Sequence, residues 1–341
     1  MKKFICLFLV IMLLGLAACS GNQSSNTQTG SSTQNQTRKM KFALASPKDH
    51  PMSQGAFKFA ELVKEKSGGT IQVEVFTDGV LGGDLATVDA MRAGTIDGGA
   101  IATAPLASVS KRFDIFELPF LFKDRETAFR VLDGPVGKDV LGDLESLGLI
   151  GLDYWENGFR HMTNNKHEVK NIADIKDIKI RTQENEMHMQ IWKTLGASPQ
   201  SVPFTELFTA LEQGVVDGQE NPYTNIQFTK IYEVQKYLTN TGHVYNVNAT
   251  IFSKKFWDSL SKEEKQIIKD ASSEATTYQR QISGEQNDSA LQALIEEGVV
   301  VTDLTQEARE EIIETVQPIY DQAKEKVGAD IIDKVVEAAK N

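Results

Sequence analysis

The stretch KIRTQENEMHMQIWKTLGASPQSVPFTELFTALEQGVVDGQENPY, residues 179–223, places several side chains at the ends of short predicted elements. A β-branched run delivers Arg181 to its end, Phe204 precedes the second of two helical segments, and Asn221 follows a predicted strand. Ligands bind where strand ends converge in open α/β sheets, so we expect these positions to line a binding site. An arginine there offers a bidentate fork that fits a carboxylate.

This stretch and several motifs elsewhere resemble the solute-binding proteins of TRAP (tripartite ATP-independent periplasmic) transporters, the DctP-like family. The motifs that carry the resemblance are LGGD at 81–84, GTIDG at 94–98, ELPFLF at 117–122, NGFRHMTNN at 157–165, KIR at 179–181, VPFTELFTALEQGVVDGQENP at 202–222 and the long helix after Trp257. The resemblance implies a two-lobed α/β fold of the periplasmic-binding-protein type, with hinge crossovers and a spine helix that spans both lobes.

Length and charge limit the possible classes of protein. A chain of 341 residues is typically divided into two domains. The net charge is −11, the pI is about 5.1, and no basic cluster is interleaved with aromatic residues. These properties argue against a nucleic-acid partner.

The N-terminus has the features of a bacterial lipoprotein signal. Two lysines precede an apolar run that is too short to span a membrane comfortably. The lipobox LAAC then predicts a signal peptide of residues 1–18 and diacylation of Cys19, with an ordinary signal peptide and a chance cysteine as the alternative. Residues 19–38 are predicted to be a lipid anchor and flexible tether, because their polar side chains cannot offset ordering entropy by burial.

Two segments resemble each other at an offset of 120 residues: AMRAGTIDG at 90–98 and ALEQGVVDG at 210–218. Each predicts a helix end, a glycine turn, a strand and an Asp-Gly pair, with the second strand at Val215 and Val216. We interpret the pair as one supersecondary unit that is used once in each of two similar lobes. Coincidence of a common αβ turn is the alternative.

The resemblance also implies where the chain crosses between the lobes. We expect lobe I to contain residues 39–157 plus about 247–285, and lobe II residues 158–246 plus about 286–341. A capping box that begins at Ser261 starts a proline-free run, which predicts a helix of roughly 50 Å.

Motifs of common enzyme classes are missing from the sequence. It has no GxSxG, no P-loop, no GxGxxG after a strand and no HExxH. The histidines show no metal-ligand spacing, and no cysteine pair remains once the signal peptide is removed. We therefore expect no enzyme activity, no cofactor and no metal.

Roles for individual residues follow from the resemblance. Arg181 matches the arginine that grips the substrate carboxylate, and Arg160 matches a second arginine near the carboxylate or its neighbouring hydroxyls. Asn221 is expected to hydrogen-bond the ligand, and Phe204 to pack on its carbon chain. A surface ion pair is the alternative for Arg181, and plain core packing is the alternative for Phe204. Weaker candidates lie on the loop after the first strand, at the crossover and beside the main site: Lys48, His50, Trp155, Glu156, Gln183 and Tyr223.

Together these features predict a lipid-anchored extracytoplasmic receptor, which delivers an organic acid to a small and a large integral membrane subunit. A sugar acid such as a uronate or aldonate is the favoured ligand, since the candidate polar residues suit hydroxyl groups. A C4-dicarboxylate needs a second cation, for which Lys48 is the available residue. Three competing interpretations are a binding protein of another importer, a chemoreceptor and a lipoprotein hydrolase.

Overall fold

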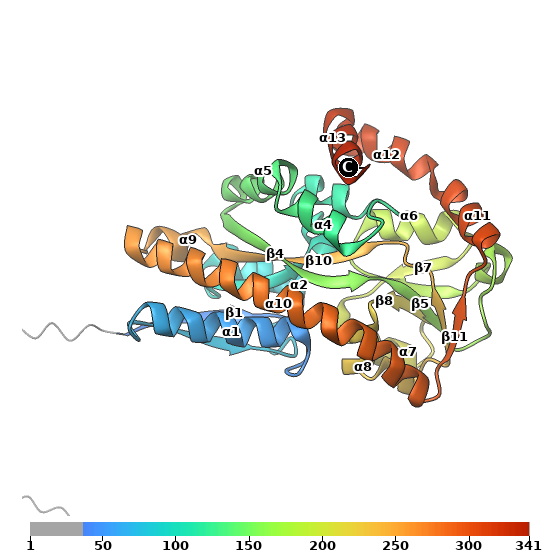
Figure 1. Cartoon of the computed structure of the whole chain (residues 1–341), viewed down its shortest axis with the longest axis horizontal. Coiled ribbons are helices and arrows are strands. Elements are labelled where there is room, and N and C mark those ends of the chain that lie inside the picture. The colour runs from blue at the N-terminus through green and yellow to red at the C-terminus, as the bar shows by residue number, and fades with distance from the viewer. Residues whose placement is uncertain (1–36, 341) are drawn as a thin grey trace, which may run out of the picture. The chain divides into compact units, whose positions relative to one another are not determined.

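The computed structural model describes residues 37–340, so the predicted signal peptide, Cys19 and most of the tether lie outside the described residues. Two β-sheets organise this part of the chain (Figure 1). Sheet A contains, in spatial order, β2 (Ile71–Phe76), β1 (Arg38–Ala43), β3 (Gly98–Ala102), β10 (Tyr245–Ser253) and β4 (Leu149–Phe159). Sheet B contains β11 (Val300–Asp303), β9 (Tyr237–Asn240), β5 (His161–Asn164), β8 (Gly218–Asn221), β6 (Lys179–Thr182) and β7 (Ser198–Ser201). We call the halves built on these sheets lobe I and lobe II.

The repeated sequence unit is present once in each lobe. In lobe I, β1 pairs in parallel with β2 and β3, and α1 (Pro51–Lys66) and α2 (Asp84–Ala93) connect these strands. In lobe II, β6 pairs in parallel with β7 and β8, and α6 (Glu186–Thr194) and α7 (Leu207–Glu212) make the connections. The predicted strand at Val215 and Val216 is wrong, however. The N–H groups of both valines donate to Ala210 O (2.9 and 3.5 Å), so they belong to the turn and β8 begins at Gly218.

The chain crosses from lobe I to lobe II between β4 and β5, and returns between β9 and β10. Arg160 is the single residue between β4 and β5, and its N–H donates to Val244 O (2.9 Å) in the returning segment. The β4–β10 register shifts beside Asn157, which is a bulge of the kind that is common next to functional sites. Gln279 satisfies the backbone there, since its amide bonds both the N–H and the C=O of Glu156 (2.8 and 2.7 Å).

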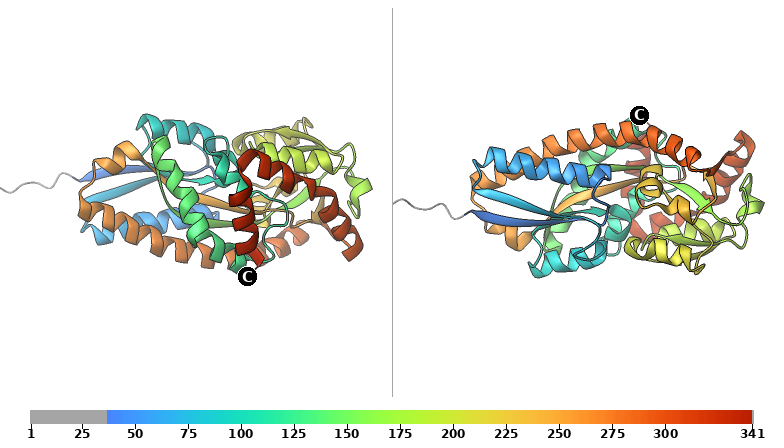
Figure 2. Two further views of the ribbon diagram at one scale, coloured as in Figure 1. Left: turned by 90° about the horizontal axis from the view of Figure 1, so that it is seen from above. Right: turned by 90° about the horizontal axis from the view of Figure 1, so that it is seen from below.

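Gln279 belongs to α10 (Lys262–Glu296), which runs beside α1 and continues onto lobe II (Figure 2). The predicted capping box is present, with Ser261 Oγ accepting from Glu264 N–H and Glu264 Oε2 accepting from Ser261 N–H. Its buried residues join both cores, Ile268 in lobe I and Leu294 in lobe II among them. The predicted spine helix is thus confirmed. Among the described helices, α10 included, none is both long and apolar enough to cross a membrane.

The C-terminal helices depart from the expected lobe boundaries. The chain forms α11 (Gln306–Val316), α12 (Pro318–Val327) and α13 (Ala329–Lys340). α12 contacts α6 of lobe II and the 3-10 helix η1 (Lys111–Phe116) of lobe I, while α13 contacts α4 (Arg125–Leu132) and α5 (Pro135–Asp143) of lobe I (Figures 1 and 2). One face of α13 is apolar, and that face is buried in the core next to lobe I. The end of the segment expected in lobe II therefore packs on lobe I.

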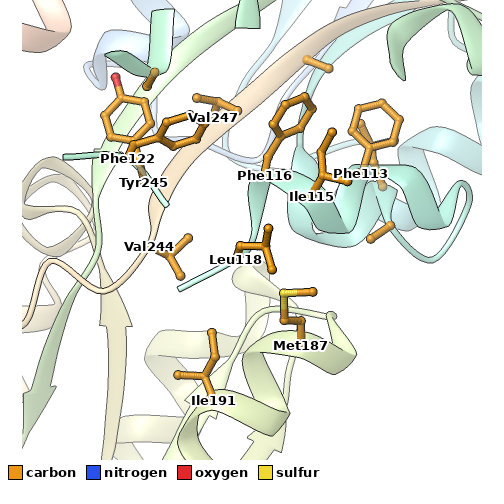
Figure 3. Close-up of a cluster of buried hydrophobic side chains, with 14 of the residues drawn as sticks. Phe113, Ile115, Phe116, Leu118, Phe122, Met187, Ile191, Val244, Tyr245 and Val247 are labelled. Carbon is orange, nitrogen blue, oxygen red and sulfur yellow. The ribbon is translucent and has the colours of Figure 1, made fainter. Parts of the chain in front are cut away.

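The ELPFLF segment, residues 117–122, packs in the apolar core where the two lobes meet. Leu118 lies among Val244 from the returning crossover and Met187 and Ile191 from α6 (Figure 3). Phe120 N–H donates to His243 O (2.7 Å). One continuous apolar cluster thus joins the two lobes on the hinge side. The polar groups described below lie at the strand ends.

Candidate functional site

Arg181 is a buried guanidinium that the protein does not fully satisfy. It lies at the end of β6 and is 1% exposed. Nε donates to Val202 O (2.8 Å), whereas Nη1 is buried and has no hydrogen-bond partner in the described structure. Burial, and then the charge of Arg160, lower the pKa of Arg181 to about 10, so the group stays charged at neutral pH. A buried charge of this kind requires a partner, and an anion would supply it.

Arg160 differs from Arg181 because its guanidinium is already paired. Nε contacts Glu220 Oε2, and Nη2 donates to Glu220 Oε1 (2.9 Å) and to the Glu220 carbonyl. Nη1 donates to Asn246 Oδ1 (3.2 Å). The ion pair is fully buried. Burial opposes the ionised form of Glu220, but the charge of Arg160 and the interactions with His188 and His243 together outweigh burial and hold the pKa of this carboxyl well below its ordinary value.

Two histidines extend this pair toward lobe I. His243 Nε2 lies 3.0 Å and His188 Nδ1 lies 3.6 Å from the Glu220 carboxylate, and His188 Nε2 lies 2.8 Å from Glu117 Oε2. Burial disfavours protonated His188, but the hydrogen bond to Glu117 and the negative charges of Glu117 and Glu220 together outweigh burial and raise its pKa to about 9. For His243, burial prevails and lowers the pKa. The cluster therefore joins α6 of lobe II to the ELPFLF segment of lobe I.

Neutral polar groups lie beside these charges. His50 caps α1, because Nδ1 accepts from Met52 N–H (3.1 Å), which leaves the proton on Nε2. Burial lowers the pKa of His50 to about 4, with the nearby Asn225 side chain opposing. No described residue gives Nε2 a hydrogen bond of ordinary geometry. Asn221, at the end of β8, is buried between Gln219 and Asn225, and its Oδ1 accepts from Asn225 (2.9 Å).

Acidic groups from both lobes face Arg181. Asp84 is the first residue of α2 in lobe I and is 8% exposed. Burial, and then the charge of Glu184, raise the pKa of Asp84 to about 7, while a hydrogen bond from the Ala102 backbone and the charge of Arg181 oppose this shift. Asn248 pairs with Ala102 across β10 and β3, and its buried Oδ1 has no partner in the described structure.

A family model for bacterial extracellular solute-binding proteins, family 7 (DctP), matches residues 42–326 of the chain. The chain belongs to the DctP family. It is the solute-binding protein of a TRAP transporter, a class of receptors that bind organic acids and work with TRAP membrane subunits.

Individual relatives of this DctP-family protein bind different acids. The 2,3-diketo-L-gulonate-binding periplasmic protein of Escherichia coli is 38% identical over 254 residues, which cover 74% of this chain and 77% of the relative. The sugar acid binding protein of Advenella mimigardefordensis, solved with galactonate, is 43% identical, with a TM-score of 0.88 over 89% of this chain and 98% of the other. A TRAP solute-binding protein of Sulfurospirillum deleyianum, solved with succinate, is 32% identical, with a TM-score of 0.84 over 87% of this chain and 98% of the other.

In this TRAP receptor some expected site residues lie around Arg181 and others do not. Gln183 is buried and its Oε1 accepts from Asn246 at the long distance of 3.5 Å. Phe204 is half-buried and lines an interlobe cavity of about 190 Å³. Lys48 is exposed on the loop after β1. The structure thus buries Gln183, places Phe204 at the interlobe cavity and leaves Lys48 at the surface, and the ligand contacts of these residues stay predictions.

Three further candidates have other partners in the structure, and their contact with a ligand stays a prediction. Trp155 is fully buried in the lobe I core, against Phe42 and with its indole N–H on Thr276 Oγ1 (2.9 Å). Glu156 is bound by Arg125 and by Tyr245 Oη (2.7 Å). Tyr223 stacks on His161 (4.1 Å between ring centroids) and donates to Asn240 Oδ1 (2.6 Å). None of these side chains has a described contact with Arg181.

Several groups at the site were not foreseen from the sequence. Asp84, Glu184 and Asn248 belong to this set, and so do His188 and Glu117 of the charged cluster. The sequence signal for Asp84 was an acidic residue after a glycine pair at a predicted helix start. The favourable interaction of an acidic side chain with a helix N-terminus explains the same pattern equally well. Among the described residues no group of three His, Cys, Asp or Glu side chains could hold a metal ion.

Proposed function

We propose that this TRAP receptor binds a hydroxylated monocarboxylate, a sugar acid such as an aldonate or uronate, through a carboxylate clamp at Arg181. The observation that carries the proposal is the difference between the two buried arginines. Arg160 is neutralised by Glu220, whereas Arg181 retains a buried Nη1 without a partner in the described structure. One unpaired guanidinium fits one carboxylate, which it holds in a bidentate pair.

The groups of lobe I suit hydroxyls better than a second carboxylate. His50 offers a neutral N–H donor, and Asn248 and Asp84 offer acceptor oxygens. A ligand hydroxyl can donate to these acceptors, whereas a second carboxylate would add negative charge near Asp84 after the first carboxylate has neutralised Arg181. The relative solved with galactonate has the same fold over nearly its whole length, which supports a sugar acid.

Titration calorimetry with galactonate, glucuronate, succinate and malate tests the ligand class. We expect wild type to bind a sugar acid much more tightly than either dicarboxylate. His50→Ala should weaken binding of the sugar acid modestly, by about 0.5–1.5 kcal/mol, as for a lost neutral contact, whereas Lys48→Ala at its exposed position should change it less. Asp84→Asn should reduce the difference in affinity between the sugar acid and the dicarboxylates, because it removes the charge that disfavours a second carboxylate.

A dicarboxylate receptor is the second candidate, because a relative of known structure holds succinate. In that case Lys48 must reach the far carboxylate. Submicromolar malate binding by wild type, abolished in Lys48→Ala, would establish this candidate and refute the sugar-acid proposal.

We also propose that the protein is a receptor without enzyme activity and that it is anchored outside the cytoplasm through a lipid on Cys19. The family and the lipobox LAAC support these two points. Wild-type protein should incorporate labelled palmitate and fractionate with membranes, whereas Cys19→Ser should do neither. Equal palmitate incorporation by the two proteins would refute the anchor. Conversion of a bound sugar acid to another product would refute the absence of enzyme activity.

A further inference from the structure

The rim of the cleft is formed in lobe I by a tight turn that connects β2 to α2. Asp78 and Gly79 both have positive φ (60° and 63°), and Val80 N–H donates to Thr77 O (3.2 Å). Two successive left-handed residues with this hydrogen bond are typical of a type I′ turn. Gly79, at the second position, adopts positive φ without strain because it has no Cβ atom.

This turn is fixed to the body of lobe I. Asp78 N–H donates to Ser46 O (2.8 Å) and Gly79 N–H donates to Leu44 O (3.2 Å), so the turn is bonded to the segment after β1. Gly82 N–H closes the loop onto Gly79 O (2.8 Å). The next residues are Gly83 and then Asp84, which faces Arg181.

Thr205 of lobe II touches the turn. A Cβ atom placed on Gly79 would lie 2.5 Å from Thr205 Cγ2, closer than real Cβ atoms approach any atom. A Cβ on Gly83 would lie 3.6 Å from Thr205 Oγ1, an ordinary contact distance. Thr205 is therefore in van der Waals contact with Gly79, and a side chain on the turn would have to displace the exposed Thr205 methyl group or move the lobes apart. It also follows Phe204, the aromatic residue that lines the interlobe cavity.

We propose that Gly79 and Thr205 form a latch, a contact made only when the lobes are closed, and that this latch sets ligand affinity without touching the ligand. The inference rests on the proposed sugar-acid function for its probe, but its residues are separate from the carboxylate clamp. Ligand binding selects the closed lobes, so any contact that exists only in the closed form adds to the measured affinity. A steric clash there lowers affinity, while the open form is unaffected.

Gly79→Ala tests the latch, with Gly68→Ala as a matched control. Both glycines have similar positive φ (63° and 58°), but a Cβ on Gly68 meets nothing within 4 Å. Calorimetry with galactonate should show about tenfold or more weaker binding for Gly79→Ala, the range expected of an overpacked contact. Gly68→Ala should bind like wild type. The two variants should unfold at similar urea concentrations without ligand, since both bear the same backbone strain.

A second substitution separates the clash from other effects of the alanine. Thr205→Ser removes Cγ2, the atom that the new Cβ would meet, so Gly79→Ala with Thr205→Ser should recover most of the lost affinity. Equal galactonate affinity of wild type and Gly79→Ala would overturn the latch, and so would a double variant that is as weak as the single one. Failure of wild type to bind any of the four acids would instead contradict the proposed function.

Discussion

In lobe I the turn after α2 ends at Asp97, whose N–H donates to Lys41 O (3.2 Å) and whose Oδ2 accepts from Lys41 N–H (2.8 Å). In lobe II the turn after α7 ends at Asp217, which makes the same two bonds with Lys179 (2.7 and 3.1 Å). In each lobe an aspartate thus ties the start of one parallel strand to its neighbour, at Lys41 within β1 and at Lys179, the first residue of β6. The backbone of the two units is the same.

The strands that leave these two turns carry different side chains. In lobe I, β3 reads GGAIA and is wholly buried with no ionisable group. In lobe II, β8 reads GQEN and brings Glu220 to the centre of the buried charges. The comparison shows that the repeated unit determines where a strand begins and ends. The residues on the strand determine which lobe contains the buried charged side chains. The substitutions below test this difference between the lobes and follow in order of decreasing expected effect.

Glu220→Gln removes the ionised group of β8, so that this strand is uncharged like β3. We expect it to have the largest effect of these substitutions, a loss of unfolding free energy. It leaves Arg160 buried without its carboxylate, which costs about 3–5 kcal/mol of unfolding free energy. Urea denaturation without ligand measures the change. Combining it with Arg160→Met should restore part of the loss, because the stranded charge is removed. A single variant as stable as wild type would mean that the ion pair contributes no net stability.

Arg181→Met should separate binding from stability. Affinity for a sugar acid should fall about a hundredfold or more, which corresponds to about 3 kcal/mol. The unfolding free energy without ligand should change little, because burial already disfavours this charge. Arg181→Lys keeps the charge but not the bidentate geometry, so it should also bind less tightly than wild type. Near wild-type affinity of Arg181→Met in calorimetry would refute the clamp.

His188 gives lobe II a pH dependence that has no counterpart on β3. Its pKa is raised from the ordinary 6.5 to about 9, so the charged imidazolium stabilises the fold fully below pH 6.5. That contribution is lost as the pH rises through about 9, and it amounts to at most about 3 kcal/mol. Unfolding free energies at pH values across this window should fall more steeply for wild type than for His188→Gln. Parallel curves would contradict the prediction.

The smallest effects should come from the turns themselves, where the two lobes are alike. Asp97→Ala and Asp217→Ala each remove a side-chain acceptor for a strand N–H, and each should lower the unfolding free energy by about 1 kcal/mol. Asp217 has an additional ion pair with Lys166 (3.0 Å), but that lysine is exposed and should add little. Urea denaturation that gives clearly unequal losses would show that the units are not energetically equivalent.

Much of this architecture could be predicted because its signals are local. The capping box of α10 and the helix breaks at Pro318 and Gly328 depend on residues a few positions apart. The position of Arg181 at a strand end depends likewise on the short β-branched run before it. Local propensity was misleading at Val215, where bonds to Ala210 keep β-branched residues in a turn.

The rest depends on distant contacts that no local pattern encodes. Trp155 and Glu156 point to opposite faces of β4, and only the packing of other elements decides that Trp155 lies in the lobe I core while Glu156 meets Arg125. Asp84 gains its role only because lobe closure brings it to Arg181. The return of α13 to lobe I likewise depends on an apolar face whose partner lies far earlier in the chain, where Arg130 donates to Ala338 O across a separation of 208 residues.

The position of β10 in the middle of sheet A also matters for the order in which the protein can fold as it is made. β10 lies between β3 and β4, yet it is synthesised only after nearly the whole of sheet B. At about 5–20 residues per second, roughly 5–20 s pass between the emergence of β4 and that of β10. Throughout that interval lobe I lacks an inner strand of its sheet and cannot complete its core. The completion of lobe I therefore waits until most of lobe II has been synthesised.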